Sequence, residues 1–109
     1  MGKGERASWM KKDQNDKAGI LRAIREKQPE LANRFTLKRI GLFGSFARDS
    51  ALPGSDVDIL IELREPTFDH YMDLKFYLEE LLNRPVDLVL NDTIKPRLKS
   101  VIEQEVVYA

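Results

Sequence analysis

Apolar and acidic residues alternate along the chain between residues 56 and 59, and Leu60 and Ile61 continue the apolar run. Val57, Ile59 and Ile61 are apolar, whereas Asp56 and Asp58 are acidic. A period of two residues is typical of a β-strand with one face against a core. Side chains at positions i and i+2 of a strand share a face, so the two carboxylates should point the same way. Their mutual repulsion would be relieved by one or two hard cations bound between them.

A short apolar run before this strand predicts another strand. Residues 40–43 read Ile-Gly-Leu-Phe and end in a Gly44-Ser45 turn. From Ile40 to Leu63 the pattern is therefore that of a strand, a glycine turn, one short helical turn, a loop and a strand. The short connection favours an antiparallel arrangement of the two strands.

Helical periodicity flanks this central stretch. Asp16 is a suitable N-cap for a helix that runs to about Lys27, with apolar residues 20, 21 and 24 on one face. Pro29 is expected to interrupt it, and a second helical piece is expected over residues 29–34. Further on, residues 68–83 predict a helix that ends near Asn83, and one of its faces carries Tyr71, Leu74, Leu78 and Leu81.

The C-terminal third predicts a strand, a helix and a short edge strand. The strand covers residues 86–91. Thr93 is the expected N-cap of the helix, and Pro96 lies in its first turn. The side chains expected to face inward from this helix are Leu98, Val101 and Ile102. Residues 106–108 are expected to form the edge strand.

The connection between the strands that begin at residues 57 and 86 determines where Asp87 lies. A strand, a helix and a strand of this length form a crossover, so the two strands should be parallel. Asp58 and Asp87 are both near the start of their strands, and parallel strands begin at the same edge of a sheet. Asp87 should therefore lie beside Asp56 and Asp58, with Gly44 and Ser45 at that same edge. The predicted fold is α/β (α+β), a small mixed sheet of three to four strands flanked by helices.

Composition narrows the possible functions. The chain has 109 residues, with 18 basic and 18 acidic side chains, so one domain is expected and no overall basic field would hold a long nucleic acid. It has no cysteine and a single histidine, His70, which leaves carboxylate oxygens as the available metal ligands. No apolar run is long enough to span a membrane, so a cytoplasmic protein is expected. Residues 1–15 are expected to be a flexible leader before a domain over residues 16–109, with Met1 or Met10 as the start.

The turn at Gly44 and Ser45 adds a possible anion site. Glycine allows close approach of a ligand to the backbone, and the N–H groups at a helix start, with the Ser45 hydroxyl, suit phosphate oxygens. Phosphoryl or nucleotidyl transfer requires carboxylates that bind magnesium and, facing them, hydrogen-bond donors that bind the phosphates.

These residues also resemble a known family. Gly44-Ser45-Phe46-Ala47-Arg48, followed by Gly54-Ser55-Asp56-Val57-Asp58, is similar to the signature of the DNA polymerase beta-like nucleotidyltransferases, with Asp87 in the place of their third carboxylate. The chain looks most like the minimal nucleotidyltransferases, the antitoxins of HEPN toxins. Many relatives have glycine after the arginine, whereas this chain has Asp49.

The resemblance implies an activity and a role for each residue. The activity is transfer of AMP from ATP to a tyrosine of the partner HEPN toxin, with two Mg²⁺ ions. Asp56, Asp58 and Asp87 would be the catalytic metal ligands, and Asp87 is also the candidate base. Gly44, Ser45 and Arg48 would bind the nucleotide.

Several alternatives stay open from the sequence. Arg48 could simply form a surface ion pair with Asp49 or Asp56. The acceptor could be a small molecule such as an aminoglycoside, with a second subunit completing the site. The protein could also be a non-catalytic antitoxin that neutralises its partner by binding. The base of the nucleotide and the oligomeric state, whether homo- or hetero-oligomer, are not determined.

Overall fold

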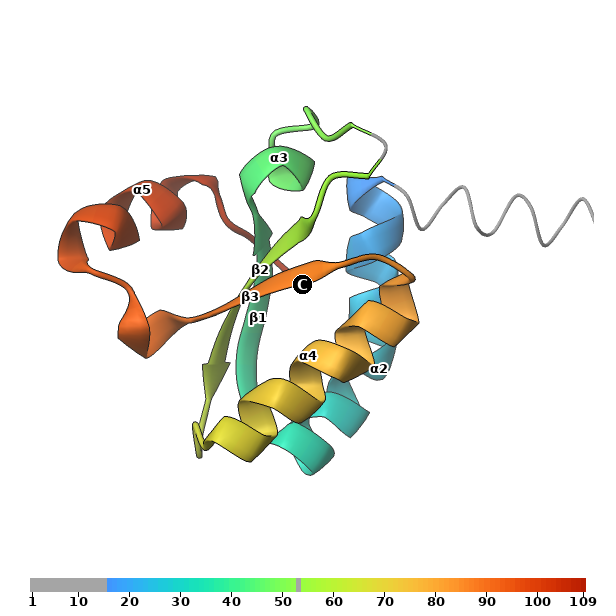
Figure 1. Cartoon of the computed structure of the whole chain (residues 1–109), viewed down its shortest axis with the longest axis vertical. Helices are drawn as coiled ribbons and strands as arrows, with labels where there is room; N and C mark the ends of the chain where they lie inside the picture. The colour runs from blue at the N-terminus through green and yellow to red at the C-terminus, as the bar shows by residue number, and fades with distance from the viewer. Residues whose placement is uncertain (1–15, 53) are drawn as a thin grey trace, which may run out of the picture.

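The computed structural model describes residues 16–52 and 54–109, and in this part of the chain four strands form one mixed sheet (Figure 1). The sheet order is β3-β2-β1-β4. β2 pairs with β3 in parallel and with β1 antiparallel, and β4 pairs antiparallel with the other side of β1. The strands are β1 (Leu37–Phe43), β2 (Val57–Leu63), β3 (Val86–Leu90) and β4 (Val107–Tyr108). The predicted fold class and strand directions are confirmed, although β1 begins three residues before Ile40.

Helices α2 (Lys17–Phe35) and α4 (Phe68–Leu82) pack against each other and cover the same side of the sheet (Figure 1). Their apolar faces and the inward residues of the strands form the core, whose fully buried members include Ile24, Leu31, Ile59, Leu74 and Leu78. On α4 the third buried position is Leu82, whereas Leu81 is only partly buried. This core holds β2 and β3 in the register that brings their acidic residues together.

α2 differs from its prediction because it continues through Pro29. Asp16 is its N-cap, as expected, and accepts a hydrogen bond of 2.8 Å from the Gly19 backbone N–H. Beyond the proline, Leu31 and Phe35 are buried on the same side as Ile24. Burial of these side chains stabilises the second half of the helix by several kcal/mol, roughly 1.5–3 for each large apolar residue, and so outweighs the cost of an interior proline.

Replacement of this proline is expected to stabilise the protein. Pro29→Ala restores a backbone N–H and removes the clash of the ring with the preceding turn, at the cost of more freedom in the unfolded chain. We expect the free energy of unfolding to rise by about 1–2 kcal/mol, measured by urea denaturation. Pro96→Ala is the control, because Pro96 lies in the first turn of its helix and should change stability by less than about 0.5 kcal/mol. A loss of stability in Pro29→Ala would contradict this account of α2.

The last helix, α5 (Pro96–Glu105), also differs from its prediction. Thr93 belongs to a separate 3-10 turn, η1 (Asn91–Thr93), and the N-cap of α5 is Lys95. No residue of α5 is buried, and the side chains of Leu98 and Val101 are 55% and 57% exposed. α5 lies on the other side of the sheet from α2 and α4 (Figure 1), where it contacts α3 (Gly44–Ala47). Its apolar residues are therefore not covered by the two helices that form the core.

The predicted edge strand is confirmed as β4, which lies beside Gly41 of β1. A Cβ atom added at Gly41 would be 2.6 Å from Val106 Cγ2 and 2.9 Å from Tyr108 Cδ1. Glycine at this position thus allows the C-terminal segment to lie close to β1. The predicted leader, residues 1–15, is outside the described residues. Among residues 16–52 and 54–109, no helix is both long and apolar enough to cross a membrane.

Candidate active site

Two of the predicted metal ligands are neighbours across adjacent strands. Asp58 and Asp87 are paired residues in the parallel register of β2 and β3, so their Cα atoms are about 4.8 Å apart and their side chains leave the same face of the sheet. Asp58 is half-buried, whereas Asp87 is exposed. The predicted meeting of these residues, which are distant in the sequence, is confirmed.

Asp56 completes the acidic group that we call the carboxylate edge, defined as Asp56, Asp58 and Asp87. It is exposed and directly precedes β2, so it lies just outside the strand in which the alternating pattern had placed it. Within the described part of the chain, no group of three or more His, Cys, Asp or Glu side chains is arranged so that it could hold a metal ion. The three acids share one end of the sheet, in an arrangement that is open to solvent.

Gly44 brings the backbone against this edge. β1 ends at Phe43, which pairs with Asp58 of β2, and α3 begins at the next residue. Gly44 has a φ of +74°, in the left-handed region that favours glycine. A Cβ atom placed there would lie 2.0 Å from Asp58 Oδ2. The predicted turn therefore lies at the edge where the sequence placed it, and its glycine is required by both conformation and space.

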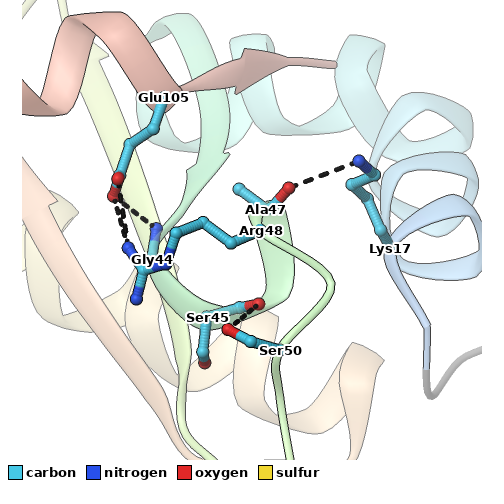
Figure 2. A network of polar contacts seen from close by, with 7 residues as sticks. All are labelled: Lys17, Gly44, Ser45, Ala47, Arg48, Ser50 and Glu105. Carbon is cyan, nitrogen blue, oxygen red and sulfur yellow. Dashed lines mark hydrogen bonds and ion pairs between the residues drawn. The ribbon is translucent and has the colours of Figure 1, made fainter.

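Arg48 and Gly44 are bound to a residue that sequence reasoning missed, Glu105 of α5 (Figure 2). The Gly44 backbone N–H donates to Glu105 Oε1 over 3.0 Å. Arg48 Nη1 donates to Oε1 and Oε2 over 3.2 and 3.0 Å. Among the residues that the structure describes, Arg48 therefore forms its ion pair with Glu105 and not with Asp49 or Asp56. Glu105 carried no signal in the sequence, because nothing in the spacing of the last helix linked it to Gly44.

Asp49 is paired from the other side of α3. Its carboxylate lies 3.3 Å from Lys17 Nζ, and Lys17 also donates to the Ala47 carbonyl over 3.3 Å (Figure 2). Asp49 has a φ of +59°, a conformation that glycine adopts without strain and aspartate tolerates better than most residues. Lys17, which the sequence did not single out, places a positive charge beside the negative charge of Asp49.

The sequence matches known proteins over most of its length. Residues 18–109 match the family model described as a nucleotidyltransferase domain. Protein adenylyltransferase MntA of Thermococcus cleftensis is 42% identical over 80 residues, which span 72% of this chain and 81% of that protein. The chain belongs to the nucleotidyltransferase domain family.

Solved structures support the same family assignment. One that is assigned as a minimal nucleotidyltransferase superposes with a TM-score of 0.72 at 36% identity, over 84% of this chain and 94% of the other. The resemblance to minimal nucleotidyltransferases seen in the sequence is thereby confirmed. A structure of a tri-AMPylated Shewanella oneidensis HEPN toxin in complex with an MNT antitoxin gives a TM-score of 0.55 at 22% identity, over 76% of this chain and 66% of the matched chain. This second likeness shows a shared fold.

Electrostatics single out Asp58 within the carboxylate edge of the nucleotidyltransferase. Burial is the main cause that raises the pKa of the Asp58 carboxyl, and the negative charges of Asp87, Asp56 and Glu105 add to it. The positive charge of Arg48 opposes the increase in pKa. A cation at this edge would offset the repulsion among the acids. Carboxylate oxygens are the type of ligand that suits Mg²⁺, so the donor set fits the metal that the family implies in its chemistry, whereas its three side chains are not arranged around one position.

This pKa increase predicts how stability depends on pH in metal-free protein. Because the folded-state pKa of Asp58 lies above its ordinary value of 3.8, the folded state binds more protons between the two values, and stability falls as pH rises through that window. Asp58→Asn removes the effect. In EDTA at pH 7 the variant should be more stable than wild type by urea denaturation, and the difference should shrink as the pH is lowered toward 3.8. A difference that does not depend on pH would contradict this assignment.

Proposed function

We propose that this nucleotidyltransferase transfers AMP from ATP to a tyrosine hydroxyl of a partner HEPN toxin, and so acts as an antitoxin. In this reaction the tyrosine oxygen bonds to the α-phosphorus, the bond between the α- and β-phosphates breaks, and pyrophosphate leaves. The single observation that supports the proposal most is the register pairing of Asp58 with Asp87 beside Gly44. The name of the Thermococcus relative and the AMPylated toxin in the structural relative support the reaction and the partner.

Each residue of the site has a proposed role. Asp56, Asp58 and Asp87 would hold two Mg²⁺ ions, and these ions would neutralise the triphosphate and activate the attacking hydroxyl. Asp87 is exposed, and we assign it as the base that accepts the proton of the acceptor. Gly44, Ser45 and Arg48 orient the triphosphate through the backbone N–H, the hydroxyl and the guanidinium.

The open surface around the carboxylate edge favours a macromolecular acceptor. Asp56 and Asp87 are both exposed. A hollow of about 790 Å³ lies elsewhere, between α2 and α4, and is lined by residues such as Arg34, Tyr77 and Glu80. Another molecule must therefore supply the rest of the binding surface for an acceptor at the carboxylate edge. A protein that presents a tyrosine provides this surface itself, whereas an aminoglycoside acceptor would require a second subunit.

The test uses ATP labelled on the α-phosphate, Mg²⁺ and a HEPN protein, to be sought in the reading frames next to the gene for this chain. The proposal is supported if the partner becomes labelled and mass spectrometry locates the label on a tyrosine. A partner in which this tyrosine is replaced by phenylalanine should then stay unlabelled. Complex formation with no transfer of label would instead establish a non-catalytic antitoxin. Transfer to an aminoglycoside but not to the partner would establish the small-molecule alternative. Parallel reactions with GTP, CTP and UTP measure the base preference.

A further inference from the structure

The carboxylate of Glu105 is bound by two of the groups proposed to hold the triphosphate. It accepts hydrogen bonds from the Gly44 backbone N–H and from Arg48 Nη1, with all three distances between 3.0 and 3.2 Å. Two carboxylate oxygens that accept from an arginine and a backbone N–H resemble two oxygens of a phosphate in charge and in hydrogen bonding. In Figure 2, Glu105 reaches from α5 to these donors on α3.

We propose that Glu105 occupies part of the triphosphate site in the nucleotide-free protein, so that ATP binds only by displacing it. This inference rests on the proposed function, because it takes Gly44 and Arg48 as nucleotide-binding groups. Glu105 is then an internal competitor that lowers the affinity for ATP. Its release also links nucleotide binding to the position of α5.

The contacts of Glu105 are of a kind that a triphosphate can replace. The side chains of Arg48 and Glu105 are 56% and 25% exposed, and ion pairs open to solvent contribute little stability. A triphosphate carries several negative charges where Glu105 carries one, so it gains more from the same donors. The charge of Glu105 also acts on Asp58, which is already beside other acids.

The attachment of α5 allows such a displacement without damage to the core. No residue of α5 is buried. After it, the described chain is held by the two residues of β4, by hydrogen bonds of Ala109 to Ile40 and Gln28, and by partly buried contacts of Val107 and Ala109 with the core. Movement of Glu105 away from Gly44 therefore requires a shift of an exposed helix, and the packing of α2 and α4 on the sheet is unaffected.

The test compares ATP binding to the full chain, measured by calorimetry with Mg²⁺ present, in wild type, Glu105→Gln and Glu103→Gln. Glu103 is the matched control, because it is an exposed acid of the same helix and its substitution changes the net charge equally. Glu105→Gln should bind ATP about fivefold more tightly, the equivalent of roughly 1 kcal/mol for an exposed ion pair. Glu103→Gln should change the Kd by less than about twofold. Adenosine, which lacks phosphates, should bind all three proteins equally.

A second variant retains the carboxylate but disturbs its support. Gly41→Ala places a methyl group 2.6 Å from Val106 Cγ2 and 2.9 Å from Tyr108 Cδ1, so these side chains, or the segment after Glu105 that carries them, must shift. ATP should again bind more tightly than to wild type. Circular dichroism melting checks that each variant is folded before it is titrated.

The outcomes separate this inference from the proposed function. If wild type binds ATP and Glu105→Gln binds it equally or more weakly, the inference is overturned while the proposed function stands. A weaker affinity would show that Glu105 positions Arg48 for the nucleotide. Equal tightening by both glutamate variants would also overturn it, because the effect would then come from overall charge. If neither wild type nor Glu105→Gln binds ATP, the proposed function fails and the inference fails with it.

Discussion

Asp58→Asn is expected to lower the rate of AMP transfer by about a thousandfold or more. Asp58 is the member of the carboxylate edge that pairs with Asp87 and lies against Gly44. Loss of its charge removes a proposed ligand of the ions that stabilise the transferring phosphate, and a loss of about 4 kcal/mol of transition-state stabilisation corresponds to this factor. The measurement is the initial rate of label transfer to the partner at saturating ATP and Mg²⁺.

The control for this prediction is Asp92→Asn. Asp92 is exposed in η1, just beyond the end of β3, and its substitution makes the same chemical change. It should leave the rate within about twofold of wild type, because long-range effects of exposed charges are screened by salt. Asp58→Asn should not melt at a lower temperature than wild type, since it removes a repelled charge. A rate that stays near wild type in a folded Asp58→Asn protein would exclude the assigned site.

Gly44→Ala is expected to lower both stability and transfer. The added Cβ would lie 2.0 Å from Asp58 Oδ2 at a φ of +74°, so the carboxylate or the backbone must move. A non-glycine residue in the left-handed region costs about 1–2 kcal/mol, and the contact with Asp58 adds to this. A displacement of about 1 Å at the reacting groups can lower the rate about a hundredfold. Urea denaturation and the transfer assay measure the two effects.

Gly54→Ala separates the effect of backbone strain from the effect of the contact. Gly54 also has a positive φ, of +92°, but a Cβ atom there would meet nothing within 4 Å. This variant should therefore lose about 1–2 kcal/mol of stability with a transfer rate within about threefold of wild type. Equal losses of transfer in both variants would show that the close approach of Gly44 to Asp58 has no special part in the reaction.

The placement of the carboxylate edge followed from rules that act over short stretches of chain. Alternation of side chains along a strand puts Asp58 on the face opposite its buried neighbours Val57 and Ile59. The length of the crossover makes β2 and β3 parallel, which aligns Asp58 with Asp87. These rules depend on backbone geometry alone, so no knowledge of the remaining packing was needed.

The sequence by itself determined the order of strands and helices, the directions of the strands and the end of the sheet at which the acids meet, because backbone periodicity and strand pairing require only local patterns. The tertiary structure alone decided that α2 continues through Pro29, that α5 leaves Leu98 and Val101 exposed, and that Glu105 reaches Gly44 across 61 positions. Each of these depends on which surfaces are already covered when distant segments meet. α2 stays helical beyond Pro29 because its second half buries apolar side chains, whereas α5 stays exposed because no core surface remains for it to cover.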